Sequence, residues 1–315
     1  MFVNRNPEYF LMIAREQNIT RAAEKLFVTQ SSLSQYISKL ETGLGVQLFD
    51  RTKSPIALTE AGQIYQRYLE SSSYLYQKLI EDLNEDRLQN VTLGIGNWRG
   101  SILIPQILPE FLRTHPGVRV KLHEYPISEL FAQVEDSKVD FAVMNVAPAR
   151  VPSTLVSEQI MEERVLLVMR RDEPVAQEYQ AAAQAGRPID LSCLETMRYV
   201  ALDSKLIVGR HIGNFLKQHH LAFPDSLSST NNRTVLRLVA AGMGFCFMVE
   251  GGLQDVLDSD LVAFDLNTPE LALPLSFLYR PNAYRSSAAM ALMDSIRTCC
   301  RSRANETKVI PLQMT

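Results

Sequence analysis

Residues 20–45 constrain the fold of this chain more than any other segment, because they predict two short helices joined by a tight turn. Ala22 and Ala23 lie on one face of the first helix, where small side chains let a second helix cross closely. Thr20 is a suitable N-cap for the first helix, and Thr29 is one for the second. The segment therefore predicts a helix-turn-helix.

The second of these helices combines a narrow apolar stripe with a polar remainder. At 100° per residue, four apolar residues fall within about 40° of one line: Leu33, Ile37, Leu40 and Leu44. The residues about 100° to 240° away are Ser31, Ser34, Gln35, Ser38, Lys39 and Thr42. Near a helix N-terminus, Gln can bond adenine edges and Ser can bond bases or phosphates. The pattern favours a helix that enters DNA, with a solvated surface helix as the alternative.

The flanking segments extend this pair of helices. Asn6 and Pro7 form the N-cap and first position of an earlier helix. Residues 46–59 alternate apolar and polar side chains around a Thr-Lys-Ser-Pro tip, as a short hairpin does. Three helices and a hairpin make a winged helix-turn-helix. Arg51 and Lys53 then lie in the wing, where cations meet phosphate or the minor groove.

A long helix is expected next. Residues 59–86 favour helix without a proline and would span about 42 Å at ~1.5 Å per residue. Six of them follow the spacing of a heptad seam: Tyr65, Leu69, Ser72, Tyr76, Leu79 and Leu83. We expect this helix to form a homodimer that presents two winged units to one DNA face. The alternative is a helix packed on its own chain.

Beyond residue 90, short β-rich runs alternate with helical segments, which predicts parallel sheets covered by helices. The expected strands are 91–96, 118–124, 140–144, 165–169, 199–202, 227–230, 245–249 and 275–279. The expected helices are 102–114, 130–136, 209–220, 232–241 and 285–303. Because the pattern restarts after residue 163, we expect two α/β lobes with a ligand cleft between them. The first lobe would contain residues 90–162 and 266–303, and the second would contain residues 163–265.

Composition limits the function further. The net charge is −3, and residues 1–60 carry seven Lys or Arg against six Asp or Glu. Because bulk charge is so small, any affinity for DNA must come from a few specific contacts and from dimerisation. No apolar run is long enough to cross a bilayer, and no signal segment is visible, so we expect a cytoplasmic protein. The four cysteines form no Cys-x-x-Cys pair, and we expect reduced thiols and no metal site.

Catalytic interpretations have little support. In residues 94–100 the third glycine comes one position late for a dinucleotide-binding turn. His211, His219 and His220 lack the i, i+4 spacing of a helical metal pair, and no Gly-x-Ser-x-Gly elbow is present. We expect no enzyme activity and no cofactor. An exported solute-binding protein would share the α/β lobes but would need a signal segment.

Four segments together resemble the LysR-type transcriptional regulators. They are residues 20–45, the Val-x-Leu-Phe-x-Arg and Leu-Thr-x-Ala-Gly motifs of residues 46–51 and 58–62, and residues 232–244. The resemblance implies a winged helix-turn-helix in residues 1–59, a linker helix in 60–89, and a two-lobed effector domain in 90–315 like type 2 periplasmic binding proteins. It also implies a sequence-specific transcriptional regulator that binds a partly symmetric site on double-stranded DNA. Such a regulator assembles into homodimers or homotetramers, responds to a small effector and contacts RNA polymerase.

The resemblance further implies which residues meet each ligand. The residues implied for DNA are Thr20, Arg21, Gln30, Ser31, Ser34, Gln35, Lys39, Arg51 and Lys53. Residues 60–87 would form the dimer helix. The residues implied for the effector are Asn97, Arg99, Gly100, Ser101, Ser128, Asn145, Ala147, Ser204, Lys205, Asn231 and Arg233. Helix N-termini and the three cations in this set favour a small anionic effector, although each cation could equally be a solvated loop residue.

Two positions depart from the family pattern. Many relatives carry arginine where Ser54 stands. Either Lys53 takes the place of that arginine, or the wing binds phosphate more weakly. Many also carry proline after the strand at 245–249, where this chain has Glu-Gly-Gly in residues 250–252.

Overall fold

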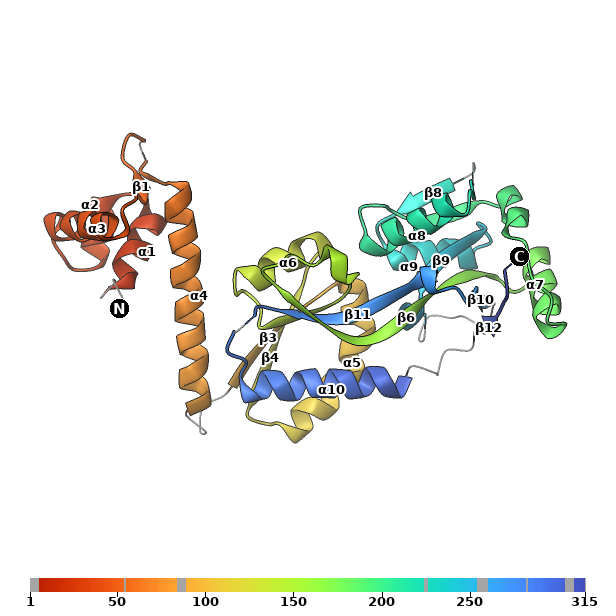
Figure 1. Cartoon of the computed structure of the whole chain (residues 1–315). Helices are drawn as coiled ribbons and strands as arrows, with labels where there is room; N and C mark the ends of the chain where they lie inside the picture. The colour runs from red at the N-terminus through yellow and green to blue at the C-terminus, as the bar shows by residue number, and fades with distance from the viewer. Residues whose placement is uncertain are drawn as a thin grey trace. The chain divides into compact units, whose positions relative to one another are not determined.

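The computed structural model describes residues 6–53, 55–83, 89–223, 226–253, 260–281, 283–303 and 309–314. The chain divides into two compact units, Met1–Ile80 and Glu81–Thr315, and each contains hydrophobic core clusters of its own (Figure 1). All four cysteines are free thiols. No helix in the described ranges is long and apolar enough to cross a membrane.

The body of the first unit consists of α1 (Pro7–Glu16), α2 (Ile19–Lys25) and α3 (Gln30–Leu44). Asn6 occupies the cap position of α1, but its side chain makes no capping hydrogen bond. Asn18 caps α2, because its Oδ1 accepts a hydrogen bond from the Arg21 backbone N–H at 3.0 Å. The prediction that Thr20 caps this helix is therefore wrong, since Thr20 lies inside it.

Helix α3 follows its predicted cap and stripe closely. Thr29 Oγ1 accepts a hydrogen bond from the Ser32 backbone N–H at 3.2 Å, as expected for an N-cap. Leu33, Ile37 and Leu40 are buried in a core that α1 and α2 share. Leu44 is exposed instead, because the helix ends there.

The wing and the long helix complete this unit. Strands β1 (Phe49–Asp50) and β2 (Ala57–Leu58) pair antiparallel, and α4 runs over Glu60–Leu83. The expected helical residues 84–86 lie outside the described part of the chain. Tyr65 packs against Phe10 with ring centroids 5.0 Å apart, and Leu69 is buried in the same core. The first half of the heptad seam therefore belongs to the winged unit itself.

The first lobe of the second unit is a mixed sheet. Strands β3 (Gln89–Ile95), β4 (Val118–Glu124) and β5 (Phe141–Asn145) run parallel, and β11 (Ala272–Tyr279) is antiparallel to β5. Helices α5 (Asn97–Thr114) and α10 (Ser287–Arg303) cover one face, and α6 (Ile127–Glu135) covers the other (Figure 1). The expected parallel sheet is confirmed for β3, β4 and β5, but β11 departs from it because the chain returns there in the opposite direction.

The second lobe is also mixed. Strands β7 (Tyr199–Leu202), β8 (Ser226–Ser229) and β9 (Phe245–Val249) run parallel. Strand β6 (Val156–Arg170) pairs antiparallel with β9 on one side and with β10 (Leu261–Asp265) on the other. Strand β12 (Ile310–Pro311) pairs parallel with β10. The helices of this lobe are α7 (Pro174–Gln184), α8 (Ile207–Gln218) and α9 (Asn232–Ala240). The sequence did not predict α7, β10 or β12.

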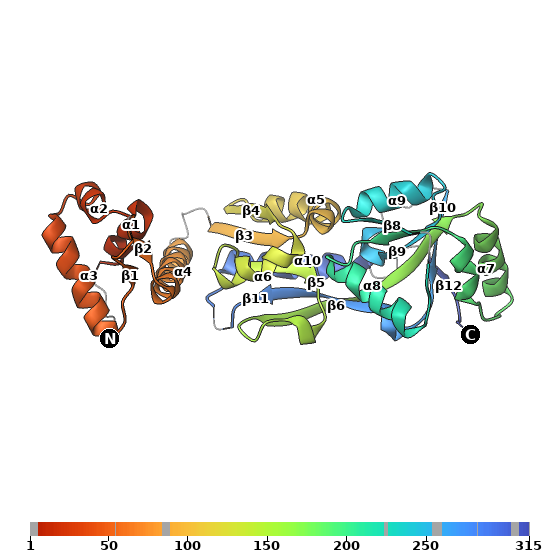
Figure 2. The same cartoon turned by 90° about the horizontal axis from the view of Figure 1, so that it is seen from above.

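Strand β6 connects the lobes. It pairs with β11 up to Arg164 and with β9 from Val165 onward, so the change of partner falls within two residues. Seen from above, β6 and β11 run from the first lobe into the second (Figure 2). Glu163 and Arg164, the last two residues of β6 that pair with β11, point to opposite faces because side chains alternate along a strand.

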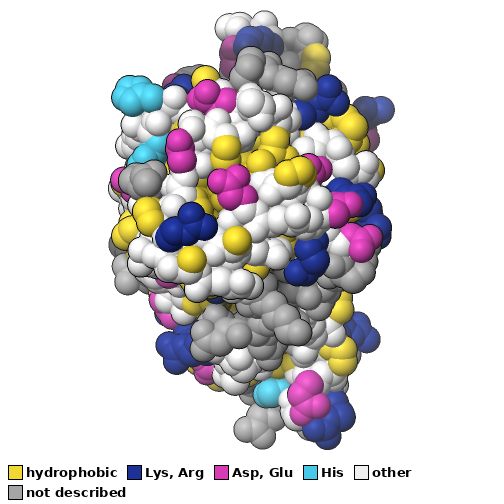
Figure 3. All heavy atoms as spheres, turned by 90° about the vertical axis from the view of Figure 1, so that its right-hand side faces the viewer, with side chains coloured by type: hydrophobic (Ala, Val, Ile, Leu, Met, Phe, Trp, Pro, Cys, Tyr) yellow, Lys and Arg dark blue, Asp and Glu magenta, His cyan; other side chains and the backbone are white. Residues whose placement is uncertain are grey.

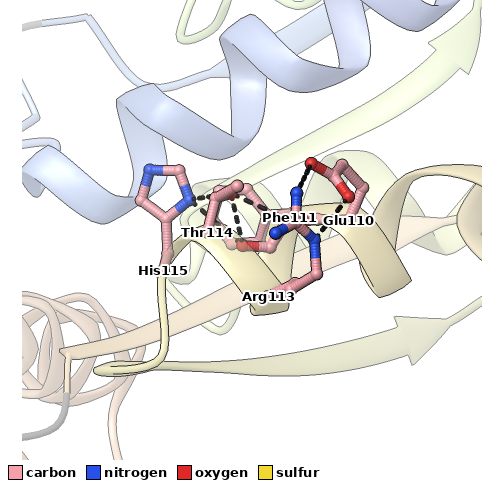
Figure 4. Close-up of polar contacts among 5 residues, drawn as sticks. All are labelled: Glu110, Phe111, Arg113, Thr114 and His115. Carbon is pink, nitrogen blue, oxygen red and sulfur yellow. Dashed lines mark hydrogen bonds and ion pairs between the residues drawn. The ribbon is translucent and has the colours of Figure 1, made fainter.

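Helix α5 is closed at its C-terminal end. The His115 ring stacks on Phe111 with centroids 4.5 Å apart, and its Nδ1 lies 2.9 Å from Thr114 Oγ1 and 3.1 Å from the Phe111 carbonyl oxygen (Figure 4). Arg113 pairs with Glu110 one turn earlier. Thr114 Oγ1 also donates to the Glu110 and Phe111 carbonyl oxygens at 3.0 Å, near the C-terminal end of the helix, whose other end carries several predicted site residues.

Candidate DNA-binding helix and interlobe residues

The first turn of α3 presents hydrogen-bonding side chains that already contact one another. Thr29 Oγ1 lies 3.0 Å from Ser31 Oγ and donates to Ser32 Oγ at 2.9 Å. Gln30 Nε2 donates to Ser34 Oγ at 3.2 Å. No acidic side chain lies in this turn, so the positive end of the helix dipole is open to an anion.

The other predicted DNA contacts also lie in the first unit. Gln35 and Lys39 are exposed farther along α3, and Thr20 and Arg21 are exposed in the first turn of α2. Two helix N-termini, those of α2 and α3, therefore carry five of the predicted contacts: Thr20, Arg21, Gln30, Ser31 and Ser34. Neutral polar groups outnumber cations among them, in agreement with the small net charge of residues 1–60.

The wing cations both have carboxylate partners. Arg51 Nη2 lies 3.0 Å from Glu41 Oε2, while Glu41 Oε1 accepts the backbone N–H groups of Leu48 and Phe49 at 2.8 and 3.1 Å. Lys53 Nζ lies 3.7 Å from Asp50 Oδ2. Arg51 thus fastens the wing to α3, and its side chain is still 43% exposed. Ser54 lies outside the described residues.

In the first lobe, the turn at the start of α5 faces carboxylates. A Cβ on Gly100 would lie 2.6 Å from Glu124 Oε1, so the Glu124 side chain occupies the first turn of this helix. Ser101 donates its hydroxyl to the Trp98 carbonyl at 2.9 Å, and Asn97 is exposed. This helix N-terminus therefore meets a carboxylate of the chain itself, which the sequence did not single out as a site residue.

Arg99 is not a free cation. Its Nη1 and Nη2 lie 2.7 and 2.5 Å from the two carboxylate oxygens of Glu163, and Nη2 donates to Asn145 Oδ1 at 2.8 Å. Asn145 Nδ2 in turn donates to Glu163 at 2.6 Å. Burial alone would lower the pKa of Arg99, but the Glu163 carboxylate outweighs burial and raises that pKa. The expected effector residues Arg99 and Asn145 thus lie together in a closed network.

The turn after β9 packs against this network. A Cβ on Gly251 would lie 2.5 Å from Arg99 Nη1, and one on Gly252 would lie 2.4 Å from Trp98 Nε1. The absence of side chains at these two glycines therefore allows Trp98 and Arg99 to approach the second lobe. One signal for this contact is visible in the sequence, a Gly-Gly pair one residue after a buried strand.

The contact between the lobes is reciprocal. Trp98, from the start of α5, packs against the core of the second lobe. Ile207, the first residue of α8, packs against a core cluster of the first lobe that contains Leu130 and Met144. Side chains of the chain itself thus fill part of the region between the lobes where the sequence placed a cleft.

A second ion network lies beside the first on β6. Arg164 Nε and Nη2 bond the Glu250 carboxylate at 2.8 and 2.5 Å, and Nη1 bonds Asp265 Oδ2 at 2.9 Å. Its bonds to Glu250 are the main reason that the pKa of Arg164 is raised. Consecutive residues of one strand are therefore each tied to other segments, Glu163 to α5 and Arg164 to the turn at residues 250–252.

The remaining predicted effector residues are more accessible. Lys205, Arg233 and Ser204 are exposed at the starts of α8 and α9, and Lys205 donates its backbone N–H to Asp203 at 2.8 Å. Asn231 is engaged as the N-cap of α9, since its Oδ1 accepts the Thr234 N–H at 3.2 Å. Two others lie in the first lobe, exposed Ser128 on α6 and half-buried Ala147 after β5.

Two features bear on whether the described residues hold a further site: the charges on one face of the second lobe and the grouping of metal-ligating side chains. The face of the second lobe around α7 carries Lys or Arg and Asp or Glu side chains interspersed with small apolar spots (Figure 3). Within the described ranges, no group of three or more His, Cys, Asp or Glu side chains is placed to hold a metal ion. His219 pairs with Glu270 at 2.5 Å, and His211 is partly buried on α8.

A winged helix-turn-helix followed by a two-lobed α/β unit defines a class, the transcriptional regulators that join a DNA-binding domain to a substrate-binding domain. Two family models match the chain: "Bacterial regulatory helix-turn-helix protein, lysR family" over residues 5–63 and "LysR substrate binding domain" over residues 85–301. The chain belongs to the LysR family of transcriptional regulators, which are not enzymes. The resemblance inferred from the sequence is thereby confirmed.

Similar proteins span nearly the whole chain. A "Probable RuBisCO transcriptional regulator" from Thalassiosira pseudonana is 26% identical and covers 89% of this chain and 92% of its own length. A "Hydrogen peroxide-inducible genes activator" from Pectobacterium carotovorum subsp. carotovorum is 25% identical, with coverage of 93% and 95%. A full-length OxyR variant from Pseudomonas aeruginosa has a TM-score of 0.67 at 20% identity, with coverage of 96% and 97%. CbnR, solved in complex with its target DNA, has a TM-score of 0.55 at 17% identity, with coverage of 94% and 99%.

Proposed function

We propose that this regulator binds a partly symmetric DNA site through α3, as a homodimer or homotetramer, and that a small acidic effector bound by the second lobe controls it. The observation that carries the DNA proposal is the first turn of α3. Gln30 and Ser31 stand there, Ser34 follows one turn later, and the first turn contains no acidic residue. Such groups bond base edges and phosphates in the major groove.

Selection from random duplexes tests the DNA proposal. The protein should enrich sequences with two related half-sites whose centres lie about one helical turn apart, and Gln30→Ala should weaken binding by about 1 to 3 kcal/mol per lost base contact and relax the preference there. Gln177→Ala, an exposed Gln on α7, is the matched control. Equal losses on selected and random DNA would remove Gln30 from base readout, and enrichment of no sequence at all would refute the DNA proposal.

The homodimer proposal rests on the second half of α4. Tyr76 is 66% exposed, and Leu79 and Leu83 on the same side of the helix are also exposed. An apolar stripe of this kind at heptad spacing is stabilised by a second copy of the same helix. Tyr76→Glu should shift the protein toward monomer in sedimentation, whereas Gln63→Glu, on the opposite side of α4, should leave the dimer intact. A dimer that tolerates both charges would place the interface elsewhere.

The effector proposal rests on the different surroundings of the predicted effector cations in the two lobes. In the first lobe, Arg99 is neutralised by Glu163, and Glu124 occupies the start of α5. In the second lobe, Lys205 and Arg233 are exposed beside the N-termini of α8 and α9. An acidic group would therefore bind the second lobe, where cations and helix dipoles favour it.

A thermal-shift screen of metabolites checks this assignment, because binding to the native state raises the melting temperature. Carboxylates or phosphates should produce the shift, and Lys205→Ala with Arg233→Ala should abolish it. Calorimetry in which only neutral or cationic metabolites bind tightly would refute the acidic class. We further propose, from family membership, that the regulator acts in the cytoplasm and contacts RNA polymerase.

A further inference from the structure

Phe27 lies in the turn between α2 and α3 with its side chain fully in solvent. Its relative exposure is 96%, the highest among the exposed large hydrophobic residues in the described part of the chain. Leu26 and Val28, its neighbours, both pack against the core of the winged unit. An aromatic ring in water forgoes the apolar burial that usually stabilises it, so folding does not account for this residue.

The backbone of the turn also disfavours phenylalanine. Phe27 has φ +55, in the left-handed region that suits glycine or asparagine. The turn is held by backbone hydrogen bonds instead, from Phe27 N–H to Glu24 at 3.2 Å and from Val28 N–H to Ala23 at 3.0 Å. The main chain thus fixes where the ring leaves the turn, without any packing of the ring itself.

The ring is continuous with the proposed DNA surface. Phe27 precedes the α3 cap, Thr29, by two residues and Gln30 by three. In a helix-turn-helix the N-terminus of the second helix enters the major groove first. The segment directly before that N-terminus must then lie at the edge of the groove, so DNA would cover Phe27.

We propose that Phe27 packs against the C5-methyl group of a thymine at the edge of the major groove, beside the bases that Gln30 contacts. This inference rests on the proposed DNA-binding function. The thymine methyl is the apolar feature of a base edge in that groove, and aromatic rings contact it. The contact would add sequence preference without adding charge, in keeping with the nearly neutral winged unit.

The experiment uses the full-length protein and the duplex that it selects from a random pool. Each thymine of the site is replaced in turn by deoxyuracil, which differs only in lacking the methyl group. At one position in each half-site, a single replacement should weaken DNA binding by the wild-type protein by about fourfold, which is the expected effect of one buried methyl group. Phe27→Ala should weaken binding by about tenfold or more and should no longer respond to that replacement.

Two further variants separate the contact from folding. Phe27→Asn suits the left-handed backbone, so it should melt no lower than the wild-type protein and still lose DNA affinity. Met290→Ala removes an exposed hydrophobic residue of α10 and should change neither property.

Wild-type affinity in Phe27→Asn would overturn the proposal and would point to a protein partner for the ring. If Phe27→Ala loses DNA affinity but responds to every deoxyuracil replacement as the wild-type protein does, the thymine assignment is overturned. A wild-type protein that selects no site would instead refute the proposed function, so the two failures are distinguishable.

Discussion

Arg99 and Glu163 form a two-pronged ion pair between the start of α5 and the middle of β6, with oxygen to nitrogen distances of 2.7 and 2.5 Å. The Glu163 side chain is only 3% exposed, so the pair is screened little by solvent. Paired guanidinium and carboxylate groups of this geometry are strong and directional. The pair therefore fixes how the first turn of α5 meets the strand that links the lobes.

Removing the negative partner should be costly. Glu163→Gln leaves the Arg99 charge buried beside a neutral amide, and the free energy of unfolding of the protein should fall by about 3 kcal/mol. Urea denaturation at neutral pH measures it. Glu162→Gln, the exposed neighbour on β6, should change it by less than about 0.5 kcal/mol. Equal effects of the two variants would contradict a buried, uncompensated charge.

The close packing of Trp98 on Gly252 gives a second prediction. Gly252→Ala places a methyl group 2.4 Å from Trp98 Nε1, so the indole or the turn must move, at about 1 to 3 kcal/mol. Gly213→Ala is the control, because a Cβ there meets nothing within 4 Å and helix α8 favours alanine. The first variant should lower the melting temperature and the second should raise it slightly. A neutral Gly252→Ala would show that this contact is not tight in solution.

The two wing cations should behave differently when removed. Arg51→Ala strips a partner from the buried Glu41 and should destabilise the winged unit by about 1 to 3 kcal/mol, as measured by thermal unfolding. Lys53→Ala should leave stability nearly unchanged. It should weaken binding to all DNA sequences alike and reduce the salt slope by about one. The assignment fails if Lys53→Ala changes sequence preference, or if Arg51→Ala folds as stably as the wild-type protein.

His211 should make the protein sensitive to mild acid. Burial lowers the pKa of His211 below 6.5, and the nearby Arg150 charge lowers it further. The unfolded chain, in which His211 has its ordinary pKa, binds this proton at a higher pH than the folded protein does. The contribution of neutral His211 to the free energy of unfolding is therefore fully present above pH 6.5 and is lost as the pH falls from there toward the folded pKa. His211→Asn should flatten the dependence of unfolding free energy on pH in that interval, whereas His220→Asn, at an exposed position, should not. Parallel pH curves for the wild-type and His211→Asn proteins would exclude this residue.

Local patterns in the sequence predicted local structure well. The stripe through Leu33, Ile37 and Leu40 and the Thr29 cap were both confirmed, and strands β4, β7 and β9 have their predicted bounds. These features depend on neighbours within a few residues, which a periodic pattern reports directly. The cap of α2 was missed because Asn18 and Thr20 are both good caps, and packing decides between them.

Contacts distant in sequence could not be predicted. Arg99 looked like a free cation because its partner Glu163 is 64 residues away, and no spacing rule links them. The antiparallel return of β11 has the same origin, since alternation of strands and helices does not fix the direction of a late strand. The half of the α4 seam at Tyr65 and Leu69 was assigned to a dimer because the pattern cannot distinguish an internal partner from a second copy.

Trp98 is the only tryptophan in the chain, and it lies where the first lobe touches the second. Intrinsic tryptophan fluorescence of the unmodified protein therefore reports on one place only. Any effector that loosens or tightens the interlobe contact should shift the emission of this indole, because its exposure to water would change. The protein thus contains its own optical probe of the contact between its two lobes.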